Sequence, residues 1–167
     1  MRHMDVEFCE RNQKRRKRHC FSGAGISKIT NEIDNIFKQP SKAMAVIKVG
    51  SNDVERLNVA EFMNKYKELI KKLKTKVQEI TIIGMLPRRF AGRKFFHNAP
   101  YLNKKLQDLS QDENIGFANF WNNFMYENHL YGRDGVHLNQ VGNARLGRLL
   151  DDAVKAENHP RNKPSGN

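Results

Sequence analysis

Cysteine is scarce in this chain of 167 residues. Cys9 and Cys20 are too few for the disulfide framework of a small secreted domain, so we expect free thiols. Long apolar runs are missing as well, because no stretch approaches the roughly 18 residues that a membrane-spanning helix needs. The opening residues also lack the apolar segment of a signal peptide. These absences predict a cytoplasmic or nuclear protein with no transmembrane segment.

Acidic residues are also in short supply, since 18 Asp and Glu stand against 30 Lys and Arg. The formal net charge of +12 favours encounters with polyanions or anionic surfaces. One run holds the cations Lys14, Arg15, Arg16, Lys17 and Arg18, a pattern found in nuclear-localisation and nucleic-acid-binding segments. The alternative interpretation of this run is a solvated loop.

Metal-ligand spacings are missing too. His19 abuts Cys20, but the sequence contains no CxxC or HxxxH pair that would hold zinc. We therefore expect no metal site.

The length predicts a single domain over residues 1–155, and the tail at 156–167 is expected to be disordered because residues 157–167 include no apolar residue for a core. Local patterns predict strands at 17–22, 43–50, 79–86 and 115–120. Apolar residues spaced three and four apart predict helices at 1–9, 26–37, 59–77, 98–109 and 139–155. In the fourth of these helices, Asn98 is expected as the N-cap and Pro100 in the first turn.

Strands that alternate with helices predict a parallel sheet between two helix layers, a three-layer α/β domain. Ligands of such open sheets bind beyond the carboxyl ends of the strands. The residues that follow each predicted strand are therefore the candidates for a functional site.

Four residues at these positions have side chains or amides suited to acyl transfer. Asp134 and His137 are three apart in a loop, so the carboxylate is able to hold the imidazole as a general base. Asn52 and the backbone N–H of Gly23 are candidate donors to an oxyanion. The structural alternatives are that Asn52 caps the long helix, that Gly23 only permits a tight turn and that Asp134 belongs to an ordinary turn.

Aromatic residues cluster before the Asp134 loop. Trp121 and Tyr131 are candidates for the wall of a substrate pocket, and packing in the core is the alternative for this cluster. Tyr131 is the aromatic residue closest in sequence to His137.

Three motifs in this chain resemble conserved blocks of the SGNH (GDSL-type) hydrolase family, in particular the esterase-like domains of animal retroelements. They are CFSGAG at 20–25, VGSND at 49–53 and DGVHLN at 134–139. The resemblance spans nearly the whole chain. It implies a flavodoxin-like SGNH fold and hydrolysis of an acyl ester, either a small molecule or a lipid, without a cofactor or metal.

The resemblance also implies roles for single residues. His137 would be the base, Asp134 the acid of the triad, and Gly23 and Asn52 the oxyanion donors. The Gly-Asp-Ser motif that carries the family's nucleophile is missing. Ser22 and Ser51 are the serines nearest to predicted strand ends.

The missing motif belongs to the first strand of the family's sheet, which would lie between the strands predicted at 17–22 and 43–50. We therefore expect a sheet without its first strand, and an acyl-ester hydrolase domain that is inactive without the nucleophile. A basic nucleic-acid-binding or interaction module derived from a retroelement protein is the alternative. The sequence does not predict the oligomeric state.

Overall fold

The computed structural model of the chain describes residue 17 and residues 19–158. The predicted opening helix and residues 159–167 of the predicted tail lie outside the described residues. So do Lys14, Arg15, Arg16 and Arg18 of the basic run, of which only Lys17 is described.

A parallel sheet forms the centre of the domain. Its strands are β1 (Met44–Ile47), β2 (Glu79–Ile83) and β3 (Gly116–Ala118), in the order β1-β2-β3. Both neighbouring pairs are parallel, with Ala45 opposite Ile80 and Ile82 opposite Phe117. These strands fall within three of the predicted segments.

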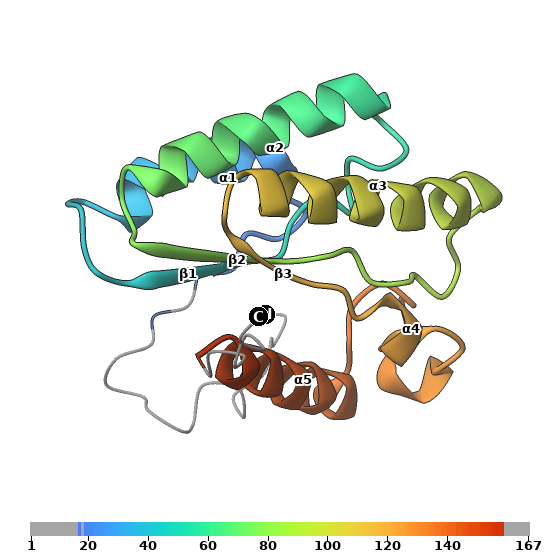
Figure 1. Cartoon of the computed structure of the whole chain (residues 1–167). Coiled ribbons are helices and arrows are strands. Elements are labelled where there is room, and N and C mark those ends of the chain that lie inside the picture. Colours follow the sequence, from blue (N-terminus) through green and yellow to red (C-terminus); the bar gives the residue numbers. More distant parts are fainter. Residues whose placement is uncertain (1–16, 18, 159–167) are drawn as a thin grey trace, which may run out of the picture.

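Helices cover both faces of this sheet (Figure 1). On one face lie α1 (Ile26–Ile36), α2 (Val59–Lys74) and α3 (Arg93–Asp112), and on the other lies α5 (Gln140–Asn158). The short helix α4 (Trp121–Phe124) and the 3-10 helix η2 (Asn128–Leu130) connect β3 to α5. The predicted three-layer α/β architecture is confirmed.

Side chains that alternate along the strands build an apolar cluster on each face. Ala45 and Ile82 pack in the cluster beneath α1, α2 and α3, whereas Val46 and Ile83 pack with Leu150 of α5. The amphipathic stripe of α2 supplies the first cluster with Phe62, Tyr66, Leu69, Ile70 and Leu73. Burial on both faces explains why the strands read as continuous apolar runs.

The strand predicted at residues 17–22 does not form in the described part of that segment, so this prediction is wrong. A strand requires a neighbour to bond with, and β1 is an edge of the described sheet. The carbonyl of Ala43 accepts from the N–H groups of Gln78 and Glu79 on the β2 side. By alternation, Met44 and Val46 direct their backbone groups to the other edge, where the described residues place no strand.

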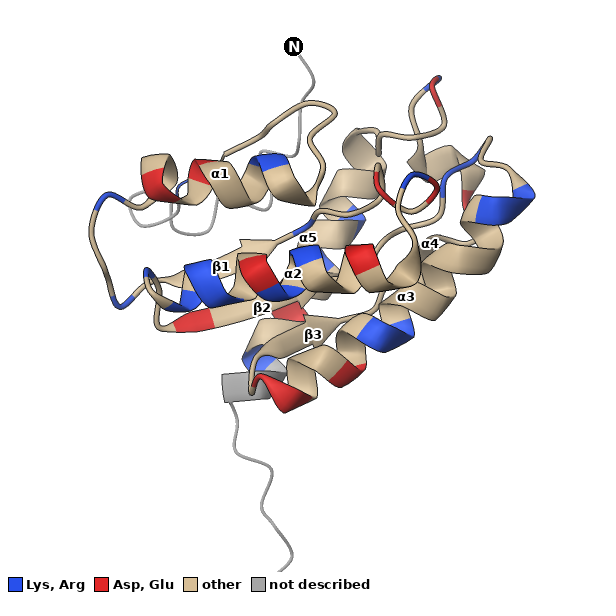
Figure 2. Ribbon diagram, turned by 90° about the horizontal axis from the view of Figure 1, so that it is seen from above, with Lys and Arg blue, Asp and Glu red and all other residues tan. Residues whose placement is uncertain are grey.

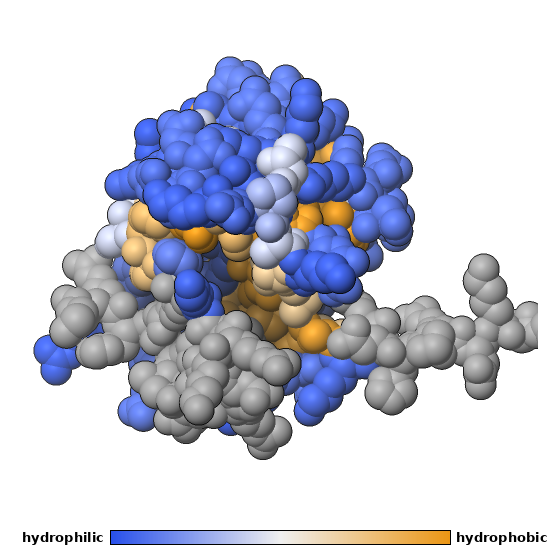
Figure 3. Space-filling view, turned by 90° about the vertical axis from the view of Figure 1, so that its left-hand side faces the viewer, coloured by the Kyte–Doolittle hydropathy of each residue, from blue (hydrophilic) through white to orange (hydrophobic). Residues whose placement is uncertain are grey.

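Apolar surface accompanies this incomplete sheet. Met44 at the start of β1 is 40% exposed. Figure 3 shows apolar surface beneath the hydrophilic helix layer when the molecule is viewed from the left-hand side of Figure 1. An exposed β-edge with apolar side chains is a feature that proteins ordinarily cover or pair.

Helix α3 begins at Arg93, with Gly92 as its N-cap, rather than at Asn98. Phe95 and Ala99 continue the buried stripe of this helix toward its start, and their burial outweighs the missing N–H of Pro100, which lies inside the helix. The prediction of Asn98 as N-cap is therefore wrong.

Asn139 links helix α5 to the preceding loop. Its Oδ1 accepts from the N–H of Gly142, which caps the first turn, and its Nδ2 donates to the carbonyls of His129 and Tyr131. The helix extends to Asn158, slightly past the predicted end of the domain. One asparagine thus fixes both the start of α5 and the loop that contains the predicted base.

Candidate active site

The loop after β2 bridges the two other loops of the predicted site. Arg88 Nη2 donates to Asn52 Oδ1 at 2.7 Å, and the backbone N–H of Arg89 donates to the carbonyl of Gly135 at 2.7 Å. Asn52 follows β1, while Gly135 lies inside the predicted Asp134–His137 motif. The structure therefore brings these segments to the same edge of the sheet.

Asp134 and His137 form a hydrogen-bonded pair. His137 Nδ1 lies 2.5 Å from Asp134 Oδ2, and both side chains are about half exposed. The other carboxylate oxygen, Oδ1, accepts from the backbone N–H groups of Val136 and His137 at 2.9 and 3.0 Å. A carboxylate held in this way fixes the imidazole through Nδ1 and leaves Nε2 available for proton transfer.

The loop around this pair depends on Gly135. Its φ of +66° is a left-handed conformation that side chains with a Cβ rarely adopt. A Cβ at this position would also lie 2.5 Å from the Phe90 ring and 2.8 Å from Arg89 Cβ. The absence of a side chain thus lets the loop after β2 approach the Asp134–His137 pair.

Hydrogen bonds hold the pKa of the Asp134 carboxyl well below its usual range. The largest cause is the backbone N–H of His137, followed by the His137 side chain and the N–H of Val136. All of these donors stabilise the charged form.

We expect the Asp134 carboxyl carbon, followed by NMR, to titrate below the ordinary aspartate value of about 3.9. Because the folded-state pKa is lowered, the loop keeps this stabilisation above the ordinary value and loses it as the pH falls through the lowered one. In His137→Ala both backbone donors remain, so the pKa should recover only part of the way. A midpoint at the ordinary value in the unaltered chain would contradict the hydrogen-bonded geometry.

Contacts on both sides fix the Asn52 side chain. An arginine only donates hydrogen bonds, so the Asn52 atom facing Arg88 must be the amide oxygen. The amide nitrogen then faces the other way and donates to the carbonyl of Ala24 at 3.3 Å. Its donor is therefore directed at the segment that contains Gly23.

The alternative in which Asn52 caps the long helix is wrong. Asn58 caps α2, since its Oδ1 accepts from the N–H of Glu61 at 2.8 Å. The neighbouring Asp53 is buried and accepts from the N–H of Ile26, the first residue of α1. Asn52 is thus free of a capping role.

The Gly23 turn lies directly before α1. Gly23 is exposed with φ of +69°, and no hydrogen bond involves its N–H among the described residues. Gly25 is required for a different reason, because a Cβ there would lie 2.6 Å from Asp53 Oδ1. The close approach of Gly25 and Asp53 joins this turn to the loop after β1.

Trp121 and Tyr131, the predicted pocket residues, are both buried. Trp121 stacks on Phe95 at 6.2 Å between ring centroids, and the hydroxyl of Tyr131 donates to the carbonyl of Pro87 at 2.5 Å. Burial raises the pKa of Tyr131 to about 12. These contacts favour the packing role over a pocket wall.

Neither serine near a strand end contacts the imidazole. Ser22 is exposed in the turn before Gly23, and Ser51 is half-buried beside Asn52. The only side-chain hydrogen bond of the His137 ring in the described part of the chain goes to Asp134. No described serine is therefore positioned by hydrogen bonding to His137.

Lysines at the end of α2 and just after it form ion pairs within the molecule. Lys72 and Lys76 both pair with Asp34, and Lys74 pairs with Glu113. Figure 2 shows basic and acidic residues interspersed along the ribbon of this helix. Helix α2 therefore does not present a uniformly basic face for nucleic acid.

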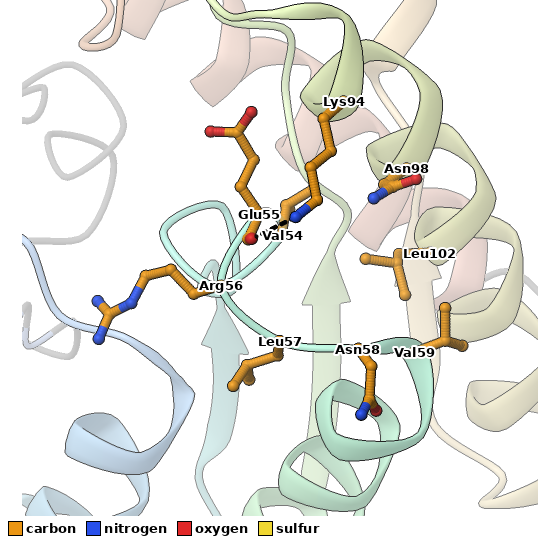
Figure 4. Close-up of a pocket in the computed structure, with 9 residues that line it drawn as sticks. All are labelled: Val54, Glu55, Arg56, Leu57, Asn58, Val59, Lys94, Asn98 and Leu102. Carbon is orange, nitrogen blue, oxygen red and sulfur yellow. Dashed lines mark hydrogen bonds between the residues drawn. The ribbon is translucent and has the colours of Figure 1, made fainter.

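A cavity of about 350 Å³ lies between the loop after Asp53 and helix α3 (Figure 4). Its apolar lining consists of Val54, Leu57, Val59 and Leu102. Lys94 also lines the cavity, and its ammonium donates a hydrogen bond to the backbone carbonyl of Glu55. None of the predicted site residues lines this cavity.

The described residues contain no group of three or more His, Cys, Asp or Glu side chains arranged to hold a metal ion. None of their helices is both long and apolar enough to cross a membrane.

Comparisons with known proteins agree with this architecture. A family profile for GDSL-like Lipase/Acylhydrolase matches residues 9–150. The fold resembles esterase EstA from Pseudoalteromonas, solved with monoethylphosphonate as inhibitor, with 19% identity, a TM-score of 0.63 and coverage of 81% of this chain and 74% of that one. A search of curated proteins found no match.

Other solved structures are similar to the same extent. The acetylxylan esterase Axe2 from Geobacillus stearothermophilus, solved as a catalytic mutant, shares 16% identity, with a TM-score of 0.67 and coverage of 80% of this chain and 68% of that one. A GDSL-like lipase from Bacteroides thetaiotaomicron shares 19% identity, with a TM-score of 0.66 and coverage of 81% and 73%. The three-layer domain and these matches define an acyl-hydrolase type of fold. The chain belongs to the GDSL-like lipase/acylhydrolase family.

Proposed function

We propose that this chain supplies the base, the acid and the oxyanion donors of a serine-type acyl-ester hydrolase site. The observation that carries the proposal is the linked set of hydrogen bonds at the sheet edge. Asp134 holds His137, and the loop after β2 connects their loop to Asn52 through Arg88 and Arg89. General base and oxyanion donor thus lie on one connected framework.

In the proposed reaction a serine hydroxyl attacks the ester carbonyl while His137 Nε2 accepts its proton. Asp134 stabilises the resulting imidazolium, and the oxyanion accepts hydrogen bonds from Asn52 Nδ2 and the Gly23 N–H. His137 then donates the proton to the leaving alcohol. Water, activated by the same imidazole, attacks the acyl-serine and releases the carboxylic acid and the free hydroxyl.

The chain by itself is proposed to be nearly inactive, because its sequence has no Gly-Asp-Ser motif to supply the serine. No strand among the described residues pairs with the outer edge of β1, and there a strand carrying that serine would find unpaired backbone groups. The carboxyl end of such a strand, parallel to β1, would lie at the same edge of the sheet as Asn52.

Turnover of 4-nitrophenyl acetate by two proteins tests this proposal. One is the chain of 167 residues, and the other carries a serine-bearing strand fused upstream through a flexible linker. We expect hydrolysis well above background only in the extended protein, and only while its added serine is intact. Equal turnover by both proteins would refute the inactive state of the chain and direct attention to Ser22 or Ser51.

A further inference from the structure

Arg88 lies beside the proposed oxyanion site and forms no ion pair with any described residue. It is half-buried, and no carboxylate of the described residues lies within ion-pair distance of it. Burial lowers the pKa of Arg88, whereas the charge of Glu55 raises it. The guanidinium nevertheless stays charged, because an arginine keeps its proton under physiological conditions.

Two contacts hold this guanidinium in place. Its Nη2 donates to Asn52 Oδ1, and its Cζ lies 5.3 Å from the centroid of the Phe95 ring. Stacking on an aromatic face fixes the plane of the group without using any of its N–H donors. Of the five N–H donors of an arginine, Asn52 accepts from one, and no other hydrogen bond with a described residue engages the guanidinium, which leaves donors for a ligand.

Partial burial removes some of the hydration of the Arg88 guanidinium, and a ligand of opposite charge would offset that cost. A planar fork of N–H donors matches the two oxygens of a carboxylate or a phosphate. Relying on the proposed hydrolase function, we infer that Arg88 binds an anionic group of the substrate, so that the site takes esters bearing a carboxylate or phosphate near the scissile bond.

The contact with Asn52 sets where that anionic group lies. Asn52 Nδ2 donates to the carbonyl of Ala24, next to the Gly23 N–H that is the other proposed oxyanion donor, and Arg88 approaches the opposite end of the same amide. The anion therefore binds about the length of one side-chain amide away from the reacting carbonyl. Esters with two or three bonds between the carbonyl and the anionic group fit this separation.

Three ethyl esters with the same two-carbon spacer test the inference on the chain of 167 residues, which is proposed not to consume them. They are monoethyl succinate with a carboxylate, ethyl 3-phosphonopropionate with a phosphonate, and ethyl succinamate with a neutral amide. Binding is followed by the NMR shift of the Asn52 side-chain amide. We expect at least one anionic ester to bind about tenfold or more tightly than the neutral one.

Variants separate a binding role from a merely structural one. Arg88→Met should remove the preference for the anionic ester, and Arg88→Lys should retain part of it. Arg89→Met is the matched control. The Arg89 side chain is exposed and lies over the Phe90 ring, and the substitution keeps the hydrogen bond from the Arg89 backbone N–H to the Gly135 carbonyl. If Arg88 only positions Asn52, Arg88→Met weakens all three ligands equally and the preference persists.

The comparison of the two anions identifies the chemistry that the site favours. Equal binding of all three esters to the unaltered chain, a preference that survives in Arg88→Met, or no binding at all would overturn the inference. The proposed function has an independent readout. Turnover of the neutral aryl ester by the serine-bearing protein would persist if only the inference about Arg88 were wrong.

Discussion

His137→Ala is expected to lower kcat/KM of the serine-bearing protein by on the order of 10⁴-fold or more. The imidazole is the only group of the proposed site that transfers the serine proton in both halves of the reaction. Without it the added hydroxyl is a weak nucleophile, although the Asn52 and Gly23 donors remain. Initial rates with 4-nitrophenyl acetate, compared with the rate of the chain that lacks the strand, measure the loss.

His129 provides the matched control for this substitution. Like His137, it has a carboxylate beside its Nδ1, that of Glu127 at 3.3 Å, and it is exposed in the same connecting segment. Its ring has no hydrogen bond to any residue of the proposed site. His129→Ala should therefore leave the rate within about twofold of the unaltered protein, because it removes an exposed side chain that is not bonded to the proposed site. Similar losses in both variants would contradict the role assigned to His137.

Elements with strong local patterns were predictable from the sequence. Helix α2 has an unbroken apolar stripe, and β2 is rich in isoleucine, so each lies within its predicted range. The segment at 17–22 differs, because nothing in its own residues determines whether a partner strand exists beside it. At α3 the proline pattern suggested a start near Asn98, but the burial of Phe95 extends the helix by more than a turn.

The candidate site divides in the same way. Asp134 and His137 are close in sequence, so their pairing followed from local spacing alone. The partnership of Arg88 with Asn52 joins residues 36 positions apart and became visible only in the folded chain. The sole sequence signal for Arg88 was its place directly after a buried strand, which it shares with several residues of no assigned role. For Trp121 the sequence left both roles open, because a large aromatic side chain fits a core and a pocket wall equally well.

Gly142→Ala is expected to destabilise the domain by about 2–3 kcal/mol, as overpacking against fixed backbone does. A Cβ on Gly142 would lie 2.1 Å from the carbonyl oxygen of Leu130, a separation that no side-chain rotation relieves. The sign of the effect is informative. Replacing a helical glycine with alanine ordinarily stabilises a protein by up to about 1 kcal/mol, since alanine is the better helix former. Urea denaturation followed by circular dichroism gives the free energy of unfolding.

The adjacent residue Val141 is 57% exposed, so Val141→Ala tests the same turn of α5 without a backbone clash. It should change the free energy of unfolding by less than about 0.5 kcal/mol. Because Asn139 ties the start of α5 to the carbonyls of His129 and Tyr131, the strain in Gly142→Ala should also reach the loop of His137. The NMR signals of that loop should broaden or shift in Gly142→Ala and stay unchanged in Val141→Ala. A stabilised Gly142→Ala variant would mean that η2 and α5 are not packed as closely as this geometry requires.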